Sequence, residues 1–134
     1  MRFLVLQHLD IEPPALIADC LLEAGHTLET VHIHKRDAIP GALSGYAGLI
    51  VMGGPMSAND KHLPFIGKEI HLLQQAIAQD FPVLGICLGA QLLAKAAGAK
   101  CLAITSSFGV EQLKEADWFA PDLSAVPDEA INWR

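Results

Sequence analysis

The chain has 134 residues, of which 51% are hydrophobic and 6% aromatic, so it is long enough to build one domain with a sizeable core. Its net charge is −6 and it has no basic run, which argues against nucleic acid or an anionic membrane as the main partner. No apolar stretch is as long as a membrane span, and the first residues do not resemble a signal peptide. Three irregularly spaced cysteines predict neither a disulfide framework nor a metal site, and we expect a cytoplasmic protein.

The hydrophobic pattern predicts strands and helices that alternate along most of the chain. Short apolar or β-branched runs predict strands at 3–7, 28–34, 48–52, 82–86 and 99–104. Helices are predicted at 15–24, 64–80 and 88–97. The middle helix carries Ile66, Ile70, Leu73 and Ile77 at helical spacing, which predicts a single apolar face. This alternation predicts an α/β fold with a largely parallel sheet covered on both faces.

The pattern weakens after the fifth predicted strand. We expect one domain over 1–134, in which 105–134 is a diverged tail. Within that tail, residues 111–118 are compatible with a helix, and residues 131–133 resemble the beginning of a strand. No internal repeat and no linker indicates a second domain.

The motif Gly-x-Cys-x-Gly at residues 85–89 is the strongest signal in the sequence. It ends an apolar run and begins a helix, so it predicts that Cys87 lies on a sharp strand-to-helix turn, as the nucleophile does in hydrolases with a nucleophile elbow. The free N–H groups and partial positive charge at a helix start favour the thiolate form of a cysteine. A lone cysteine in an apolar run is more often buried and inert, but this motif favours a catalytic ancestry.

A second glycine turn follows the preceding strand. Residues 53–57 read Gly-Gly-Pro-Met-Ser, and the carboxyl ends of neighbouring parallel strands meet at one edge of a sheet. The N–H groups of this turn, together with that of Leu88, are therefore expected to form an oxyanion hole beside Cys87. His8 ends the first strand and is the best placed of six histidines, although a histidine there is more often solvated or structural. Cys20 and Cys101 are expected in the core.

Three stretches, at residues 48–57, 59–79 and 82–94, resemble the class I (triad-type) glutamine amidotransferases, and above all stand-alone proteins similar to the amidotransferase domain of GMP synthase. The similarity covers about residues 1–104. It implies a flavodoxin-like, doubly wound, mostly parallel sheet that is incomplete at the C-terminus.

The resemblance also implies a reaction and a set of site residues. Cys87 would attack the side-chain amide of glutamine, form a γ-glutamyl thioester and release ammonia. The N–H groups of Gly54 and Leu88 would hold the oxyanion, and Gly53 and Gln91 would bind the substrate. The family carries its catalytic histidine and glutamate in a later His-Pro-Glu motif that this sequence lacks. We therefore expect a truncated member with weak or no glutaminase activity.

Two other functions fit the same residues. One is a cysteine hydrolase of the same topology that acts on γ-glutamyl compounds or small peptides, with a histidine such as His8 serving Cys87. The other is a non-catalytic module that binds glutamine or a partner subunit. As partners of the chain we expect glutamine as a small-molecule substrate, and either a synthase or a second copy of the chain that pairs through an open sheet edge. No metal or organic cofactor is indicated.

Overall fold

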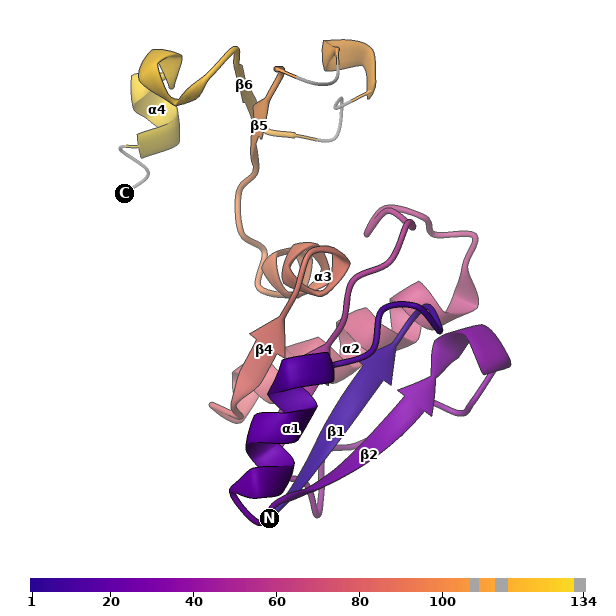
Figure 1. Cartoon of the computed structure of the whole chain (residues 1–134). Coiled ribbons are helices and arrows are strands. Elements are labelled where there is room, and N and C mark those ends of the chain that lie inside the picture. Colours follow the sequence, from indigo (N-terminus) through magenta and orange to yellow (C-terminus); the bar gives the residue numbers. More distant parts are fainter. Residues whose placement is uncertain (107–108, 113–115, 132–134) are drawn as a thin grey trace. The chain divides into compact units, whose positions relative to one another are not determined.

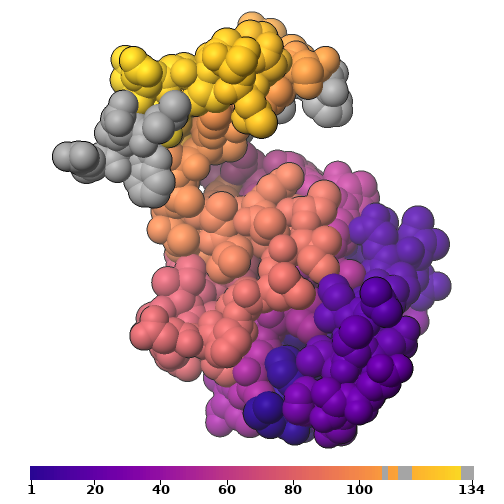
Figure 2. All heavy atoms as spheres, turned by 60° about the vertical axis from the view of Figure 1, so that its left-hand side comes forward, coloured from indigo at the N-terminus to yellow at the C-terminus, as the bar shows by residue number. Residues whose placement is uncertain are grey.

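The computed structural model of the chain describes residues 1–106, 109–112 and 116–131. It divides into two compact units, Met1–Gly98 and Ala99–Arg134 (Figure 1). In Figure 2 the atoms of the first unit, coloured indigo to salmon, form one closely packed body. The boundary between the units falls before residue 105, where the predicted tail begins, and the single domain over 1–134 stays a prediction.

A four-stranded parallel sheet forms the centre of the first unit. Its strands lie in the order β2-β1-β3-β4, which matches the first four strands of the flavodoxin-like order 2-1-3-4-5. The predicted α/β fold with a parallel sheet is therefore confirmed. The elements in chain order are β1 (Arg2–Gln7), α1 (Ala15–Glu23), β2 (Thr27–His32), a 3-10 helix (Ile33–Lys35), β3 (Gly48–Val51), α2 (Pro64–Ala78), β4 (Val83–Gly85) and α3 (Leu88–Ala96).

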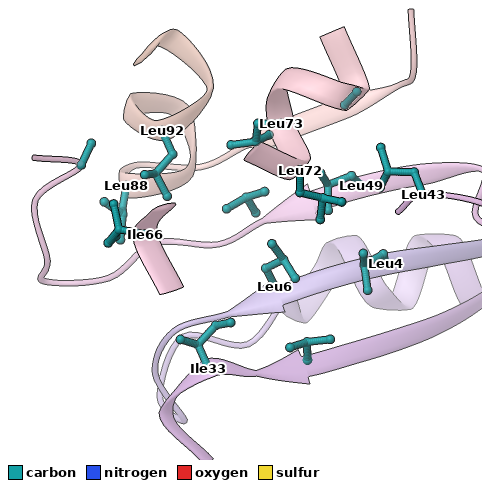
Figure 3. Packing of buried hydrophobic residues seen from close by; sticks show 14 residues of the cluster. Leu4, Leu6, Ile33, Leu43, Leu49, Ile66, Leu72, Leu73, Leu88 and Leu92 are labelled. Carbon is teal, nitrogen blue, oxygen red and sulfur yellow. The ribbon is translucent and has the colours of Figure 1, made fainter. Parts of the chain in front are cut away.

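Helices cover both faces of this sheet. Because side chains alternate along a strand, Leu4 and Leu6 of β1 point toward α2 and α3, where they join a cluster that includes Leu73 and Leu92 (Figure 3). Val5 points to the other face and packs against α1, which contributes Ile17. Figure 1 shows α1 and α2 on opposite sides of the sheet. The carboxyl ends of β1, β3 and β4 are thus left at one edge of a rigid layer.

The second unit contains a pair of short parallel strands, β5 (Leu102–Ile104) and β6 (Trp118–Ala120). Asp117 supports this pair, since its carboxylate accepts hydrogen bonds from Nζ of Lys100 and from the N–H of Cys101, both at 2.8 Å. The remaining elements are 3-10 helices at Val110–Gln112 and Leu123–Ala125 and one helical turn, α4 (Asp128–Ile131).

Several predicted elements differ from the structure in this region. The predicted fifth strand is shorter and pairs with β6 instead of extending the four-stranded sheet. Of the helix expected at 111–118, residues 111–112 belong to a 3-10 helix and Trp118 begins β6 instead, whereas residues 113–115 lie outside the described residues. Of the strand expected at 131–133, Ile131 ends α4 instead, and the other two residues lie outside the described residues.

Three predictions in the first unit also need correction. The strand expected at 28–34 ends at His32, because the chain turns into a 3-10 helix that is closed by Arg36 with φ 64°. The strand expected at 82–86 belongs to a sheet predicted to be covered on both faces, but it is partly open. Among the described strands β4 pairs with β3 alone, and Leu84 is 46% exposed. On α2 the buried face is rotated from the predicted one, so that Glu69 is buried whereas Ile77 is 41% exposed.

Candidate active site at the carboxyl ends of the strands

Cys87 is an exposed free thiol on the turn between β4 and α3. It forms the N-cap of α3 with φ 50° and ψ −110°, a conformation that costs a residue with a side chain roughly 1–3 kcal/mol. The predicted placement of this thiol on a strained strand-to-helix turn is confirmed. The turn exposes the sulfur at the positive end of a helix, where an anion is stabilised.

The two glycines of the motif allow this turn to form by close backbone approach. A Cβ atom on Gly85 would lie 2.7 Å from backbone atoms of Gly89 and Ala90. A Cβ atom on Gly89 would overlap the carbonyl oxygen of Val51 in β3 and lie 2.7 Å from its carbonyl carbon. Because any larger side chain would push α3 away from the sheet, these glycines set the position of Cys87.

The Gly53–Gly54 turn follows β3 and lies beside the start of α3. A Cβ atom on Gly53 would lie 3.5 Å from Cβ of Cys87, and one on Gly54 would lie 3.2 Å from Cδ2 of Leu88. Within the described part of the chain, the N–H groups of Gly54 and Leu88 donate no hydrogen bond. Two backbone N–H groups at this edge of the sheet are therefore left without an acceptor, and Gln91 is exposed on the first turn of α3.

His8 lies directly after β1 and is fully buried, with 0% of its surface exposed. Its Nε2 lies 3.0 Å and 3.1 Å from the two carboxylate oxygens of Glu69, and its Nδ1 lies 3.1 Å from the carbonyl oxygen of Gly53. Burial lowers the pKa of His8, but the hydrogen bond and charge of Glu69 and the nearby carbonyl oxygens outweigh it, so the pKa is raised. Both ring nitrogens are engaged, and neither bonds to Cys87.

Two acidic residues near the site were missed by sequence reasoning. Oε2 of Glu12 would lie 2.7 Å from a Cβ atom on Gly53, on the side that faces Cys87. This carboxylate has no hydrogen-bond or ion-pair partner among the described residues, so it can accept an ammonium group of a ligand. No motif marks Glu12. Glu69, by contrast, had a signal, since its spacing from the buried Ile66 places it on the apolar face of α2.

The other two cysteines are not core residues. Cys20 and Cys101 are both exposed, because α1 buries none of its residues fully and Cys101 precedes the short strand β5. The expectation that they lie in the core is wrong. In the described ranges, no group of three or more His, Cys, Asp or Glu side chains is arranged to hold a metal ion, and none of the helices found there has the length and apolar character needed to cross a bilayer.

The turn and the thiol define a class of α/β protein with an exposed cysteine on a strained strand-to-helix turn. Residues 10–119 match the family model for class-I glutamine amidotransferases. The chain belongs to this family.

Relatives of known sequence and structure agree with this assignment. Over 81 residues the chain is 33% identical to the glutamine amidotransferase-like protein YfeJ of Salmonella typhimurium, a match covering 58% of this chain and 34% of that protein. It is 31% identical over 87 residues to the glutamine-hydrolyzing GMP synthase of Caldicellulosiruptor saccharolyticus, covering 64% of this chain and 16% of that enzyme.

Two solved structures superpose well on this chain. A glutamine amidotransferase from Methylobacillus flagellatus matches with a TM-score of 0.69 and 38% identity, over 72% of this chain and 39% of that one. A glutamine amidotransferase from Thermotoga maritima matches with a TM-score of 0.68 and 30% identity, over 73% of this chain and 43% of that one. The matched segment spans less than half the length of each of these proteins. These superpositions show that the matched part of this chain has a flavodoxin-like fold.

Proposed function

We propose that this chain binds glutamine beside α3 and that Cys87 attacks the carbon of its side-chain amide. The bond from Sγ to that carbon forms, the carbon–nitrogen bond breaks, and ammonia leaves with a proton. Water then releases glutamate from the γ-glutamyl thioester and restores the thiol. The observation that carries this proposal is the exposed Cys87 at φ 50° next to the Gly53–Gly54 turn.

Backbone N–H groups stabilise the charge that develops in this reaction. The carbonyl oxygen of the amide becomes negative as sulfur attacks, and we assign it to the N–H groups of Gly54 and Leu88, which donate no hydrogen bond among the described residues. Losing one donor of this kind typically slows acyl transfer by about 10²–10³-fold. Gly53 borders the substrate, and Gln91 at the exposed start of α3 contacts its polar end.

The position of the Glu12 carboxylate favours free glutamine as the substrate over a glutamine residue within a peptide. Its unpaired carboxylate lies against Gly53 on the side of Cys87, where it can form an ion pair with the α-ammonium group of a free amino acid. Glutamine should therefore protect Cys87 from alkylation better than N-acetylglutamine does, and Glu12→Gln should abolish this difference. Equal protection of the unaltered chain by both compounds would contradict this role.

Turnover by this chain should be slow. Among the described residues no histidine is hydrogen-bonded to Cys87, and general acid–base help is typically worth about 10²–10⁴-fold in rate. The alternative in which His8 serves Cys87 has no support, because both nitrogen atoms of His8 bond elsewhere. We therefore expect the thioester to form but to be released slowly.

Labelling with the diazo ketone analogue of glutamine tests the proposal. It should modify Cys87 and spare Cys20 and Cys101, although all three thiols are exposed. Cys87→Ser should abolish labelling, whereas the matched variants Cys20→Ser and Cys101→Ser should not change it. Equal labelling of all three thiols would refute the proposed site. Protection by glutamine without any ammonia release would instead favour a non-catalytic glutamine-binding module.

The ammonia released here would be passed to a synthase partner. The similarity to glutamine-hydrolyzing GMP synthases supports a partner of this kind. Self-association is the alternative, since one edge of β4 has no partner strand among the described residues and Leu84 is half exposed. Sedimentation at increasing concentration separates the two, because a strictly monomeric chain argues against self-association.

A further inference from the structure

His8 and Glu69 form a buried pair of ionisable side chains beneath the candidate site. Both are 0% exposed, and the ring nitrogen Nε2 contacts both carboxylate oxygens. A buried ion pair often contributes less to stability than apolar side chains of similar volume would. Packing alone therefore does not explain why these two side chains lie here.

The hydrogen bonds of this pair set the protonation of His8. A backbone carbonyl oxygen only accepts hydrogen bonds, so Nδ1 of His8 must donate to Gly53. We assign a proton to Nε2 as well, so that it donates to an ionised carboxylate of Glu69, which can only accept. With both nitrogens donating, the ring is an imidazolium, and the raised pKa of His8 agrees with this state.

The bond to Gly53 also determines where an adjacent N–H points. The carbonyl of Gly53 and the N–H of Gly54 belong to the same planar peptide unit, and the described chain contains no cis peptide bond. In a trans peptide the C=O and the N–H point in opposite directions. When His8 holds the carbonyl oxygen on the buried side, the N–H of Gly54 is turned to the opposite side.

We propose that the His8–Glu69 pair positions the oxyanion donor of this site by clamping the peptide between Gly53 and Gly54. This inference rests on the proposed function, because it gives the pair a role in that reaction. A clamp is needed at this point, since a peptide between two glycines can flip with little steric cost. His8 also lies against the turn itself, as a Cβ atom on Gly54 would lie 3.0 Å from Cβ of His8.

The charged bond should strengthen the donor as well as orient it. A donor that polarises a carbonyl makes the N–H of the same peptide unit a better donor, since hydrogen bonds in series reinforce each other. Glu69 acts indirectly, because its charge keeps His8 doubly protonated. His8 and Glu69 are therefore positioning residues that never touch the substrate.

Two reagents that attack Cys87 differently test the clamp. Iodoacetamide alkylates sulfur and expels iodide, so it creates no negative oxygen. Succinic semialdehyde adds the thiol to its carbonyl carbon and places the proton on the former carbonyl oxygen, which occupies the position of the oxyanion. The affinity for the aldehyde is measured by the protection of Cys87 from iodoacetamide.

The double variant His8→Leu/Glu69→Met removes the clamp without leaving a buried charge, so it should stay folded. We expect its affinity for the aldehyde to fall by about 10²-fold, with an unchanged rate of alkylation. His8→Asn/Glu69→Gln keeps a donor near Gly53 and should recover part of the affinity. The matched control His71→Leu, at an exposed position of α2, should behave as the unaltered chain. An unaltered aldehyde affinity in the first double variant would overturn the proposal.

The unaltered chain provides an independent test through pH. Neutral His8 has a single N–H, which the charged carboxylate of Glu69 holds more strongly than the neutral carbonyl of Gly53 does, so the bond to Gly53 is the one that breaks when the ring loses a proton. The amide resonance of Gly54 should therefore shift as His8 titrates, above the ordinary histidine pKa of 6.5, while that of exposed Gly67 should not. If the chemical shift of the Gly54 amide does not change while His8 titrates, the proposed clamp is wrong. If Cys87 forms no adduct with the aldehyde and is not labelled by the diazo ketone analogue of glutamine either, the proposed function fails, and the Gly54 resonance still decides whether His8 clamps this peptide.

Discussion

The two units of this chain differ in the interactions that stabilise each of them internally. Met1–Gly98 buries large aliphatic side chains on both faces of a four-stranded sheet. In the described part of Ala99–Arg134 only two hydrophobic side chains are buried, Ala103 and Ala120, and polar contacts such as the one between Lys100 and Asp117 join its strands. The comparison teaches that the fold that carries the candidate site is stabilised by burial, whereas the second unit has little core of its own.

The largest expected effect on stability comes from Gly89, where the backbone of α3 lies closest to the backbone of β3. Gly89→Ala would place a methyl group into the carbonyl of Val51, so α3 would have to move from the sheet. We expect a loss of more than about 4 kcal/mol in the free energy of unfolding. Urea denaturation measures it.

Gly67→Ala is the matched control, because a methyl group there meets nothing within 4 Å on α2. It should stabilise the chain by roughly 0.5–1 kcal/mol, the difference in helix propensity between the two residues. Similar losses in both variants would contradict the close packing of α3 on β3.

Replacing one leucine in each unit by alanine compares the cores of the two units directly. Leu92 is 0% exposed within the core between α3 and the sheet, whereas Leu123 is 78% exposed. Leu92→Ala should cost about 2–5 kcal/mol through lost burial and a cavity, and Leu123→Ala should change stability by less than about 0.5 kcal/mol. The Tm of each variant, measured by thermal unfolding, decides this. Similar decreases in Tm would show that Leu123 contributes to a hydrophobic core in the second unit.

The smallest expected effect is a difference in pH dependence. The pKa of His8 is raised because Glu69 and the carbonyl oxygens outweigh its burial. The resulting stability is fully present below pH 6.5, the ordinary histidine pKa, and is lost as pH rises through the folded-state pKa. Urea midpoints at increasing pH measure this loss for the first unit.

The second unit should respond in the opposite direction. The Lys100 ammonium and the N–H of Cys101 lower the pKa of Asp117 below 3.8. Its contribution is therefore present above that value and is lost as pH falls through the folded-state pKa. The amide resonances of Cys101 and Trp118 should move in acid while those of β1 do not. A shared response of both units would contradict their separate stabilisation.

Much of the first unit could be predicted because its signals are local. Apolar runs, Pro and Gly boundaries and the Gly-x-Cys-x-Gly motif indicated the strands, the helices and the turn at Cys87. Errors arose where neighbours decide the outcome. Leu84 is exposed on β4, which has one partner strand in the described part of the chain, and Ile77 is exposed because α2 turns a different face to the sheet.

Sequence alone determined the α/β fold and the placement of Cys87, because hydrophobic period and close glycine packing act over a few neighbouring residues. Tertiary structure alone decided the burial and the partners of His8, since Glu69 lies 61 positions away along the chain. The same holds for Glu12, which has no local pattern and reaches Gly53 only once β1 and β3 pair. Contacts between distant segments depend on how the whole sheet assembles, which no short stretch of sequence encodes.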